Sequence, residues 1–97
     1  MTTATQTKPL FSLGQVTATP DCLAAILSSG EFPTTYTHRH QHGQWGDLGA
    51  ADQAENDLSV REGYRILSAY ILPTGVRIYV ITEHDRSLTT LLLCSEY

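Results

Sequence analysis

Residues 36–48 concentrate side chains that can do chemistry. They hold three of the chain's four histidines and its only tryptophan. His38, His40 and His42 recur at every second residue, so a strand would point all three one way, whereas a helix would pair only His38 with His42. Zinc needs three or four converging ligands, and Asp47 is the one further ligand nearby. This spacing is a loose pattern for a metal site, so we expect no metal and no cofactor.

Trp45 has a simpler interpretation than a catalytic or ligand-binding residue. A tryptophan in a loop usually packs at the edge of the core and fixes the loop around it. Gly43 and Gly46 would give the backbone the freedom for a close approach. A loop fixed in this way would hold His40 and Asp47 in place for any binding role.

A second polar cluster lies in residues 81–90, where Glu-His-Asp-Arg at 83–86 forms the expected tip of a hairpin. Turn formation explains much of this composition, because Asp and Ser make local hydrogen bonds. Arg86 could also act with Arg65 and Arg77 on the neighbouring strands. Such arginines form either an ion-pair ladder or a phosphate clamp beside a general acid or base. The ladder is the favoured alternative.

The N-terminal half predicts a strand followed by a helix that would support these clusters. Residues 11–19 have strand composition, weakened by Gly14. Residues 19–30 predict a helix with Thr19 as N-cap, Pro20 as its first residue and Gly30 at its end. We expect its core-facing stripe to be Leu23, Ile26 and Leu27.

The middle of the chain predicts a helix at residues 50–63, and a short helix can form before it. Residues 33–43 can form a short helix that ends at Gly43, and the segment around Trp45 is loop-like. Residues 50–63 predict a weakly amphipathic surface helix stopped by Gly63. Its expected apolar residues are Ala51, Ala54, Leu58 and Val60.

The C-terminal third predicts three strands, at residues 64–72, 76–82 and 87–93. Their short connections require antiparallel neighbours, which makes a three-stranded meander. Alternation places Arg65 and Leu67 on one face and Ile66 and Ser68 on the other. One face should pack on helices, while the mixed face is typical of a binding surface. The fold class is therefore α+β: an N-terminal strand and helix, a second helix and a C-terminal antiparallel meander.

Length and composition limit the architecture and the partners. The chain has 97 residues, which predicts one domain, at residues 10–97, while the Thr-rich, polar composition of residues 1–9 predicts a disordered tail. Its formal net charge of −4 argues against tight binding of duplex DNA. No secretory signal or membrane-spanning run is visible, which predicts a cytoplasmic protein. Cys22 and Cys94 show no metal-ligand spacing and are expected to be reduced, with a disulfide as the alternative.

Several segments carry a resemblance to a known family: FSLGQVTAT, RHQHGQWGDL, EGYRILSAY, PTGVRIYVITEHDRSLTTLLL and SEY. Over residues 10–97 the chain resembles small proteins of bacterial plasmids and other mobile elements, labelled plasmid-related proteins or type I restriction subunits. Members read Arg-His-x-x-Gly-Asp-Trp-Gly-Asp-Leu, and the chain matches at Arg39, His40, Gly43, Trp45, Gly46, Asp47 and Leu48. Gln44 stands where the family has an acid. The resemblance implies an accessory protein of a mobile element without supplying a mechanism.

The C-terminal strands, RILSAYILPTGVRIYVITEHDRSLTT, are also faintly similar to the closing strands of barnase-like ribonucleases. Such enzymes need a general base, a general acid and arginines that stabilise the phosphorane. By this resemblance Glu83 or Asp85 would exchange protons with His84 or His40, and Arg65 and Arg86 would hold phosphate.

Three functional hypotheses follow. The leading one is an accessory or interaction protein of a bacterial mobile element that acts through a polar pocket or a sheet face. The alternatives are a metal-independent barnase-like ribonuclease and an inhibitor of a host defence nuclease. A protein or RNA partner would suit these functions, and Tyr64, Tyr70 and Tyr79 would line a homodimer face as readily as a core.

The predicted site lies where residues 38–48 meet the hairpin tip at 83–86. For an enzyme, the catalytic residues would be His40, Glu83, Asp85 and Arg86. The predicted binding residues are Trp45, Asp47, Arg65, Tyr70 and Thr89.

Overall fold

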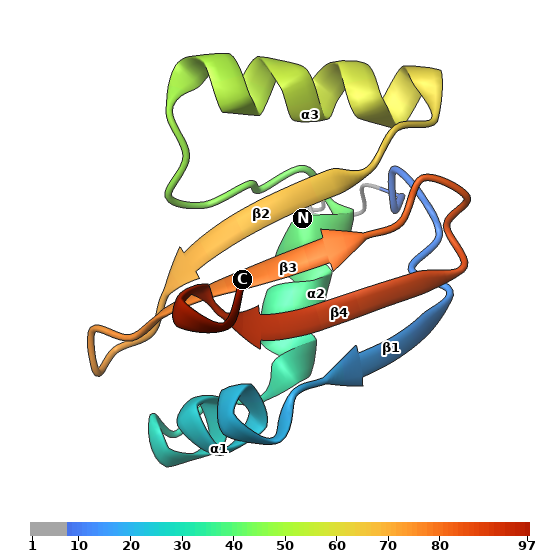
Figure 1. Ribbon diagram of the computed structural model, residues 1–97. Coiled ribbons are helices and arrows are strands. Elements are labelled where there is room, and N and C mark those ends of the chain that lie inside the picture. The colour runs from blue at the N-terminus through green and yellow to red at the C-terminus, as the bar shows by residue number, and fades with distance from the viewer. Residues whose placement is uncertain (1–7) are drawn as a thin grey trace, which may run out of the picture.

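The computed structural model describes residues 8–97, so residues 1–7 of the predicted disordered tail at 1–9 lie outside the described part. Within that part, three α-helices and one four-stranded sheet form an α+β fold (Figure 1), as the sequence predicted. The elements are β1 (Gln15–Ala18), α1 (Pro20–Ser28), α2 (Pro33–Gln41), α3 (Ala50–Glu62), β2 (Ile66–Ile71), β3 (Arg77–Thr82), β4 (Leu88–Leu93) and the short 3₁₀-helix η2 (Cys94–Glu96).

The sheet has the order β1-β4-β3-β2 and combines a meander with one parallel strand. β2, β3 and β4 are antiparallel neighbours, with Ala69 opposite Tyr79 and Tyr79 opposite Leu92, which confirms the predicted meander. β1 runs parallel to β4, so the sheet is mixed. The N-terminal strand is also shorter than the predicted 11–19. Gly14, at φ 63°, lies where an added Cβ would collide with the backbone of Arg86 and Ser87, so the chain turns there before pairing begins.

α1 has the predicted start but a different buried stripe. The Thr19 side chain accepts a hydrogen bond from the Cys22 backbone N–H at 3.2 Å, and Pro20 is the first helical residue. Ile26 and Cys22 are buried. The predicted stripe is wrong at Leu23 and Leu27, which are 39% and 48% exposed, because this short helix contacts β4 along a single row of residues four positions apart.

α2 is the optional short helix of the sequence interpretation, and it divides the histidine triplet. His38 and His42 lie on an exposed face with ring centroids 4.2 Å apart, whereas His40 is fully buried. α2 ends before Gly43, which has φ 81°. The helix therefore delivers one imidazole to the interior and two to the surface.

α3 is held against β2 by polar side chains. Asn56 is buried, donates to the Leu67 carbonyl oxygen at 2.7 Å and accepts from the Leu67 N–H at 3.2 Å. Of the four apolar residues expected along this weakly amphipathic surface helix, Ala51 and Ala54 are exposed, and Leu58 and Val60 are half-buried. Gly63 ends the helix in the left-handed conformation, as predicted.

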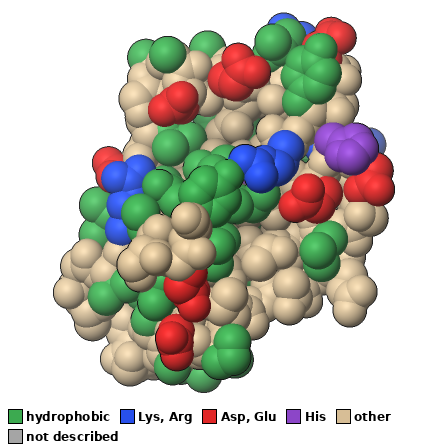
Figure 2. All heavy atoms as spheres, viewed as in Figure 1, with side chains coloured by type: hydrophobic (Ala, Val, Ile, Leu, Met, Phe, Trp, Pro, Cys, Tyr) green, Lys and Arg blue, Asp and Glu red, His purple; other side chains and the backbone are tan. Residues whose placement is uncertain are grey.

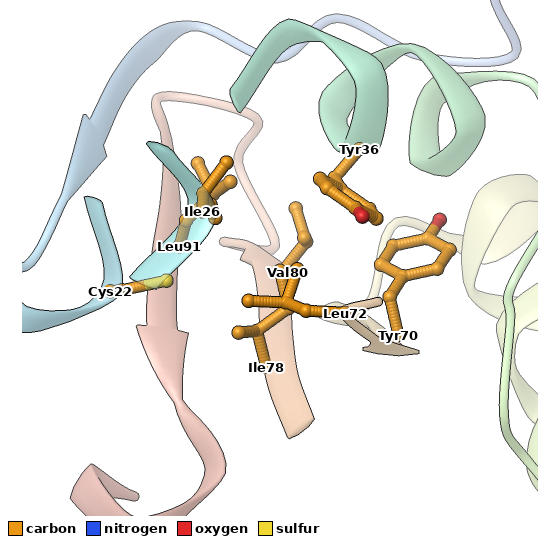
Figure 3. Close-up of a cluster of buried hydrophobic side chains, with 8 residues drawn as sticks. All are labelled: Cys22, Ile26, Tyr36, Tyr70, Leu72, Ile78, Val80 and Leu91. Carbon is orange, nitrogen blue, oxygen red and sulfur yellow. The ribbon is translucent and has the colours of Figure 1, made fainter. Parts of the chain in front are cut away.

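Different helices pack on the two faces of the sheet. α1 and α2 pack on one face, and their buried side chains meet those of the strands (Figure 3). This cluster consists of Cys22, Ile26, Tyr36, Tyr70, Leu72, Ile78, Val80 and Leu91. The opposite face, seen in Figure 1, has α3 along its β2 edge and η2 lying over it, and no other helix of residues 8–97 covers it. None of the helices in the described part is long and apolar enough to cross a membrane.

Candidate functional site

His40 joins the two polar clusters of the sequence through a buried chain of hydrogen bonds. Its Nδ1 lies 2.6 Å from Ser68 Oγ on β2, and its Nε2 lies 2.9 Å from Thr82 Oγ1 on β3. Thr82 Oγ1 is 2.7 Å from Thr89 Oγ1 on β4, and Thr89 donates to the Leu13 carbonyl oxygen at 2.7 Å. The network thus crosses the sheet from α2 to the segment before β1.

The last carbonyl fixes the direction of every proton in this chain. Because a carbonyl oxygen only accepts, the single hydroxyl proton of Thr89 goes to Leu13, and Thr82 must donate to Thr89. Thr82 then accepts from His40 Nε2–H, which leaves Nδ1 to accept from Ser68. The neutral Nε2–H tautomer of His40 is therefore the form that this network requires.

His40 is unsuited to exchange protons at neutral pH. Its side chain is enclosed, with the Phe11 ring 5.1 Å and the Trp45 ring 6.0 Å away between centroids. Burial, together with the Arg86 charge, lowers its pKa from 6.5 to about 3. The imidazole therefore organises the interior rather than meeting a ligand.

The last link of the network predicts the effect of a single substitution. Thr89→Val keeps the shape of the side chain but removes both the donor to Leu13 and the acceptor for Thr82. We expect a loss of about 2 kcal/mol in the free energy of unfolding, measured by urea denaturation. Thr90→Val, at a half-buried position on the other face of β4, should change it by less than about 0.5 kcal/mol. Equal effects of the two variants would contradict the network.

Trp45 anchors its loop, as predicted, while the residues after it extend the sheet edge. Trp45 is 4% exposed, packs with Phe11 and donates from Nε1 to Asp57 at 3.0 Å. Its carbonyl accepts from the Ala69 N–H at 3.1 Å, and the Asp47 N–H donates back to the Ala69 carbonyl at 2.6 Å. The loop thereby closes the free edge of β2.

Arg86 serves the fold. Its guanidinium donates to the carbonyl oxygens of Ser59 at 2.8 Å and Tyr64 at 2.7 Å, where α3 ends. It also lies 5.6 Å from the centroid of the Phe11 ring. These contacts tie the β3–β4 hairpin to α3, so the Arg86 donors are engaged by backbone rather than left for a phosphate.

Replacement of Arg86 tests this structural role. In Arg86→Lys an ammonium cannot reproduce the fork that reaches two carbonyls, and we expect about 2 kcal/mol of destabilisation. Arg61→Lys, at an exposed position on α3, should be neutral within about 0.5 kcal/mol in the same urea titration. A similar result for both variants would remove the structural assignment.

Most of the predicted site residues have partners outside the predicted site. Asp47 forms an ion pair with Arg77 at 3.3 Å, Asp85 accepts from Ser87 inside its turn, and Arg65 donates to the Tyr97 hydroxyl. The Ser87 hydrogen bonds hold the pKa of Asp85 below its usual value. The predicted site consisted of His40, Asp47, Arg65, Glu83, Asp85 and Arg86. Among residues 8–97, the hydrogen bonds that join any two of these six run from the Arg86 backbone N–H and guanidinium to the Glu83 carbonyl oxygen, at 2.9 and 3.1 Å within the hairpin turn, and no ion pair joins any two.

The predicted binding residues divide between interior and surface. Thr89 and Tyr70 are buried, like Trp45, and Tyr70 donates its hydroxyl proton to the Gln44 carbonyl at 2.6 Å. Thr89 and Tyr70 therefore stabilise the fold, and Tyr70 belongs to the core rather than to an exposed dimer face. Only Asp47 and Arg65 of this set are exposed.

A groove on the sheet face opposite α1 and α2 is lined by Arg65 and by Arg77, the ion-pair partner of Asp47. It has a volume of about 330 Å³ and lies between α3 and strands β2 and β3. Its lining residues are Leu48, Asp52, Glu55, Asn56, Arg65, Leu67, Arg77 and Tyr79; we call it the sheet groove. This size suits a small ligand or one large side chain of a partner.

Two tyrosine rings lie between two arginines on this face. The Arg77 guanidinium lies 5.6 Å from the Tyr79 ring, Tyr79 contacts Tyr97 edge-to-face at 5.4 Å, and Arg65 lies 5.7 Å from the Tyr97 ring. Figure 2 shows basic side chains on both sides of a hydrophobic strip, with acidic side chains above them over α3. The groove thus combines apolar floor, two cations and the carboxylates of Asp52 and Glu55.

The sequence interpretation missed the contribution of α3 to this groove. Asp52, Glu55 and Asn56 recur at helical spacing and face one side, which is the signal that a polar inner face leaves in a sequence. Within the described residues, no group of three or more His, Cys, Asp or Glu residues is arranged to hold a metal ion. Both cysteines are free, and burial of the Cys22 thiol raises its pKa to about 11, so it is a weak nucleophile.

Comparison of the chain with protein-family models, with curated proteins and with solved structures gave no match.

Proposed function

We propose that this chain is a non-catalytic binding protein that docks a partner protein in the sheet groove. The supporting observation is the groove itself, which combines an apolar floor with groups of both charges on a sheet face that α1 and α2 leave uncovered. Aromatic and arginine side chains of this kind supply most of the binding energy in protein interfaces. Opposite charges beside them select the orientation of the partner.

The biological setting in this proposal comes from the resemblance to proteins of plasmids and other mobile elements. An accessory protein of such an element would bind a protein of the element or of its host. A second copy of the chain is the competing occupant of the groove, because Tyr79 and the exposed Tyr97 lie on the same face and could form a homodimer interface.

Site-specific crosslinking tests the docking site. A photoreactive amino acid at Glu55, on the groove wall, should give one discrete protein adduct in cells that carry the element. The same probe at Ala24, exposed on α1 in the other layer, should give none. Arg65→Glu should weaken the adduct about tenfold, whereas Arg61→Glu should not. Equal labelling from both probe positions, no adduct, or an adduct with the mass of a second copy would contradict a separate protein partner.

The ribonuclease alternative receives less support from the geometry. It needs an imidazole and a carboxylate within reach of one phosphate, with an arginine beside them. His40 is enclosed, and the Arg86 donors are bound to backbone carbonyls. The catalytic roles of Glu83, Asp85 and the exposed His84 stay predictions.

RNA cleavage in EDTA decides between the alternatives. We expect the purified protein to cleave single-stranded RNA no faster than Glu83→Ala or His84→Ala, measured by gel electrophoresis of a labelled substrate. Cleavage by the unmodified protein that either variant lowers by about a hundredfold would restore the enzyme hypothesis. The inhibitor hypothesis has the least support, because the acidic residues are spread along the chain without an acidic run.

A further inference from the structure

A second pocket lies beside the tryptophan loop and shares no lining residue with the sheet groove. Its volume is about 420 Å³. The lining residues are Arg39, Gly43, Gln44, Trp45, Gly46, Gln53 and Tyr70; we call it the Arg39 pocket. Five of the seven belong to the segment 39–46, and Gln53 closes the pocket from α3.

Arg39 differs in its hydrogen bonding from the arginines that line the sheet groove or stabilise the hairpin. Arg65, Arg77 and Arg86 each donate hydrogen bonds to the protein. No hydrogen bond or ion pair in the described part of the chain involves the Arg39 guanidinium, although Tyr36 holds it in place by a cation–π contact at 5.6 Å. Tyr36 is fixed in turn by its hydrogen bond to Glu31 and its contact with Tyr70. Among residues 8–97 the Arg39 donors are therefore positioned but make no hydrogen bond.

The remaining walls favour a negative group. No Asp or Glu lines the pocket, although the whole chain has a net charge of −4. Gln44 and Gln53 contribute side-chain amides, and Gln53 uses one of its donors on the Leu48 carbonyl at 2.9 Å. Trp45 and Tyr70 are rigid, because each has its polar atom hydrogen-bonded within the protein. A rigid pocket with amide donors and a guanidinium that no other described residue engages by a hydrogen bond fits an oxyanion.

We propose that the Arg39 pocket binds the oxyanion of a small ligand, a phosphate or a carboxylate, through the Arg39 guanidinium. The planar fork of arginine matches both groups with two parallel hydrogen bonds. Gln44 and Gln53 would supply further donors, and the volume accommodates a small organic molecule rather than a polymer. This site is independent of the sheet groove and of any partner bound there.

NMR titration of the full chain with inorganic phosphate tests the site, at a constant ionic strength set with sodium chloride. The indole N–H of the single tryptophan gives a unique signal in the pocket wall. We expect saturable shifts of this signal and of the amides of residues 39, 43–46 and 53, with a Kd of about 1 mM or lower. Arg39→Gln should weaken binding at least about tenfold, because a charged hydrogen-bonding pair is lost. Arg61→Gln removes the same charge from α3 and should leave binding unchanged.

Three results would overturn the proposal. They are shifts that grow linearly without saturating, equal affinity in Arg39→Gln and Arg61→Gln, and no shift at the tryptophan indole and its neighbours. A parallel titration with acetate identifies the preferred oxyanion: tighter binding of acetate would indicate a carboxylate ligand, and tighter binding of phosphate a phosphorylated one. Failure here would leave the crosslinking test of the sheet groove unaffected, since the two sites share no residue.

Discussion

Lowering the pH from 7 to about 3 is expected to remove about 4 kcal/mol of unfolding free energy through His40 alone. The pKa of this imidazole is about 3 in the folded protein and near 6.5 when the chain unfolds. Between these values the unfolded state binds the extra proton and the folded state does not. The contribution of His40 to the free energy of unfolding is therefore fully present above about pH 6.5. It falls by about 1.4 kcal/mol for each pH unit below that value, down to about pH 3.

The hydrogen-bond network explains why the folded protein resists this proton. Nδ1 of His40 accepts from Ser68, so a proton placed there would require the Ser68 hydroxyl to reverse and find another acceptor in the core. The site also excludes water, which penalises the imidazolium, and the Arg86 charge adds to the cost. A chain of this size has only a small stability margin, so acid unfolding should begin well above pH 3.

His40→Gln separates this effect from general acid sensitivity. Its amide can still form hydrogen bonds with Ser68 and Thr82 but cannot titrate. Urea denaturation between pH 3.5 and 7.5 should show a flattened pH dependence in the variant and a lower stability at pH 7. His38 and His84 are exposed and His42 is half-buried, and all three remain in both proteins, so they cancel in the comparison. Identical slopes in the two proteins would show that His40 is not the titrating group.

Local patterns predicted the parts of the fold that local chemistry determines. Thr19 and Pro20 start α1 and Gly63 ends α3 because caps and a left-handed glycine act within a few residues. The alternation predicted for residues 65–68 is confirmed, because Ser68 contacts His40 on the helix-covered face, whereas Arg65 and Leu67 line the sheet groove on the other face. The parallel pairing of β1 with β4 depends on contacts across the whole chain, such as that of Gly14 with the Arg86–Ser87 backbone, and no local pattern encodes it.

In the candidate site, too, local patterns predicted some features, and others depend on contacts between distant residues. The sequence interpretation brought residues 38–48 close to the last hairpin, and His40 does contact Thr82 there. For an enzyme, the resemblance to barnase-like ribonucleases made His40 a catalytic candidate, and no local pattern marked this imidazole as buried. Ser68, Thr82 and Thr89 gave a usable signal, because each is a small polar residue on the face of its strand that otherwise carries Ile, Val, Leu or Tyr. Polar residues at such positions need a buried partner, and His40 is that partner.

Gly46→Ala is expected to destabilise the protein by about 3 kcal/mol or more, and by more than any surface substitution proposed here. Gly46 has φ 82°, a conformation that costs alanine about 1 kcal/mol. An added Cβ would also collide with the Ala69 carbonyl oxygen and the Tyr70 ring. The backbone of this loop would have to move away from β2, which breaks the hydrogen bond from Asp47 N–H to Ala69.

Gly30→Ala is the matched control for the collision of the added Cβ. Gly30 has the same φ of 82°, but an added Cβ there meets no atom within 4 Å. Its variant should lose only about 1 kcal/mol, the conformational part of the cost. Thermal unfolding of both variants should therefore show a melting temperature at least about 8 °C lower for Gly46→Ala than for Gly30→Ala. Equal melting temperatures would mean that the loop after Trp45 does not press against β2, and the closed edge of the sheet would lose its basis.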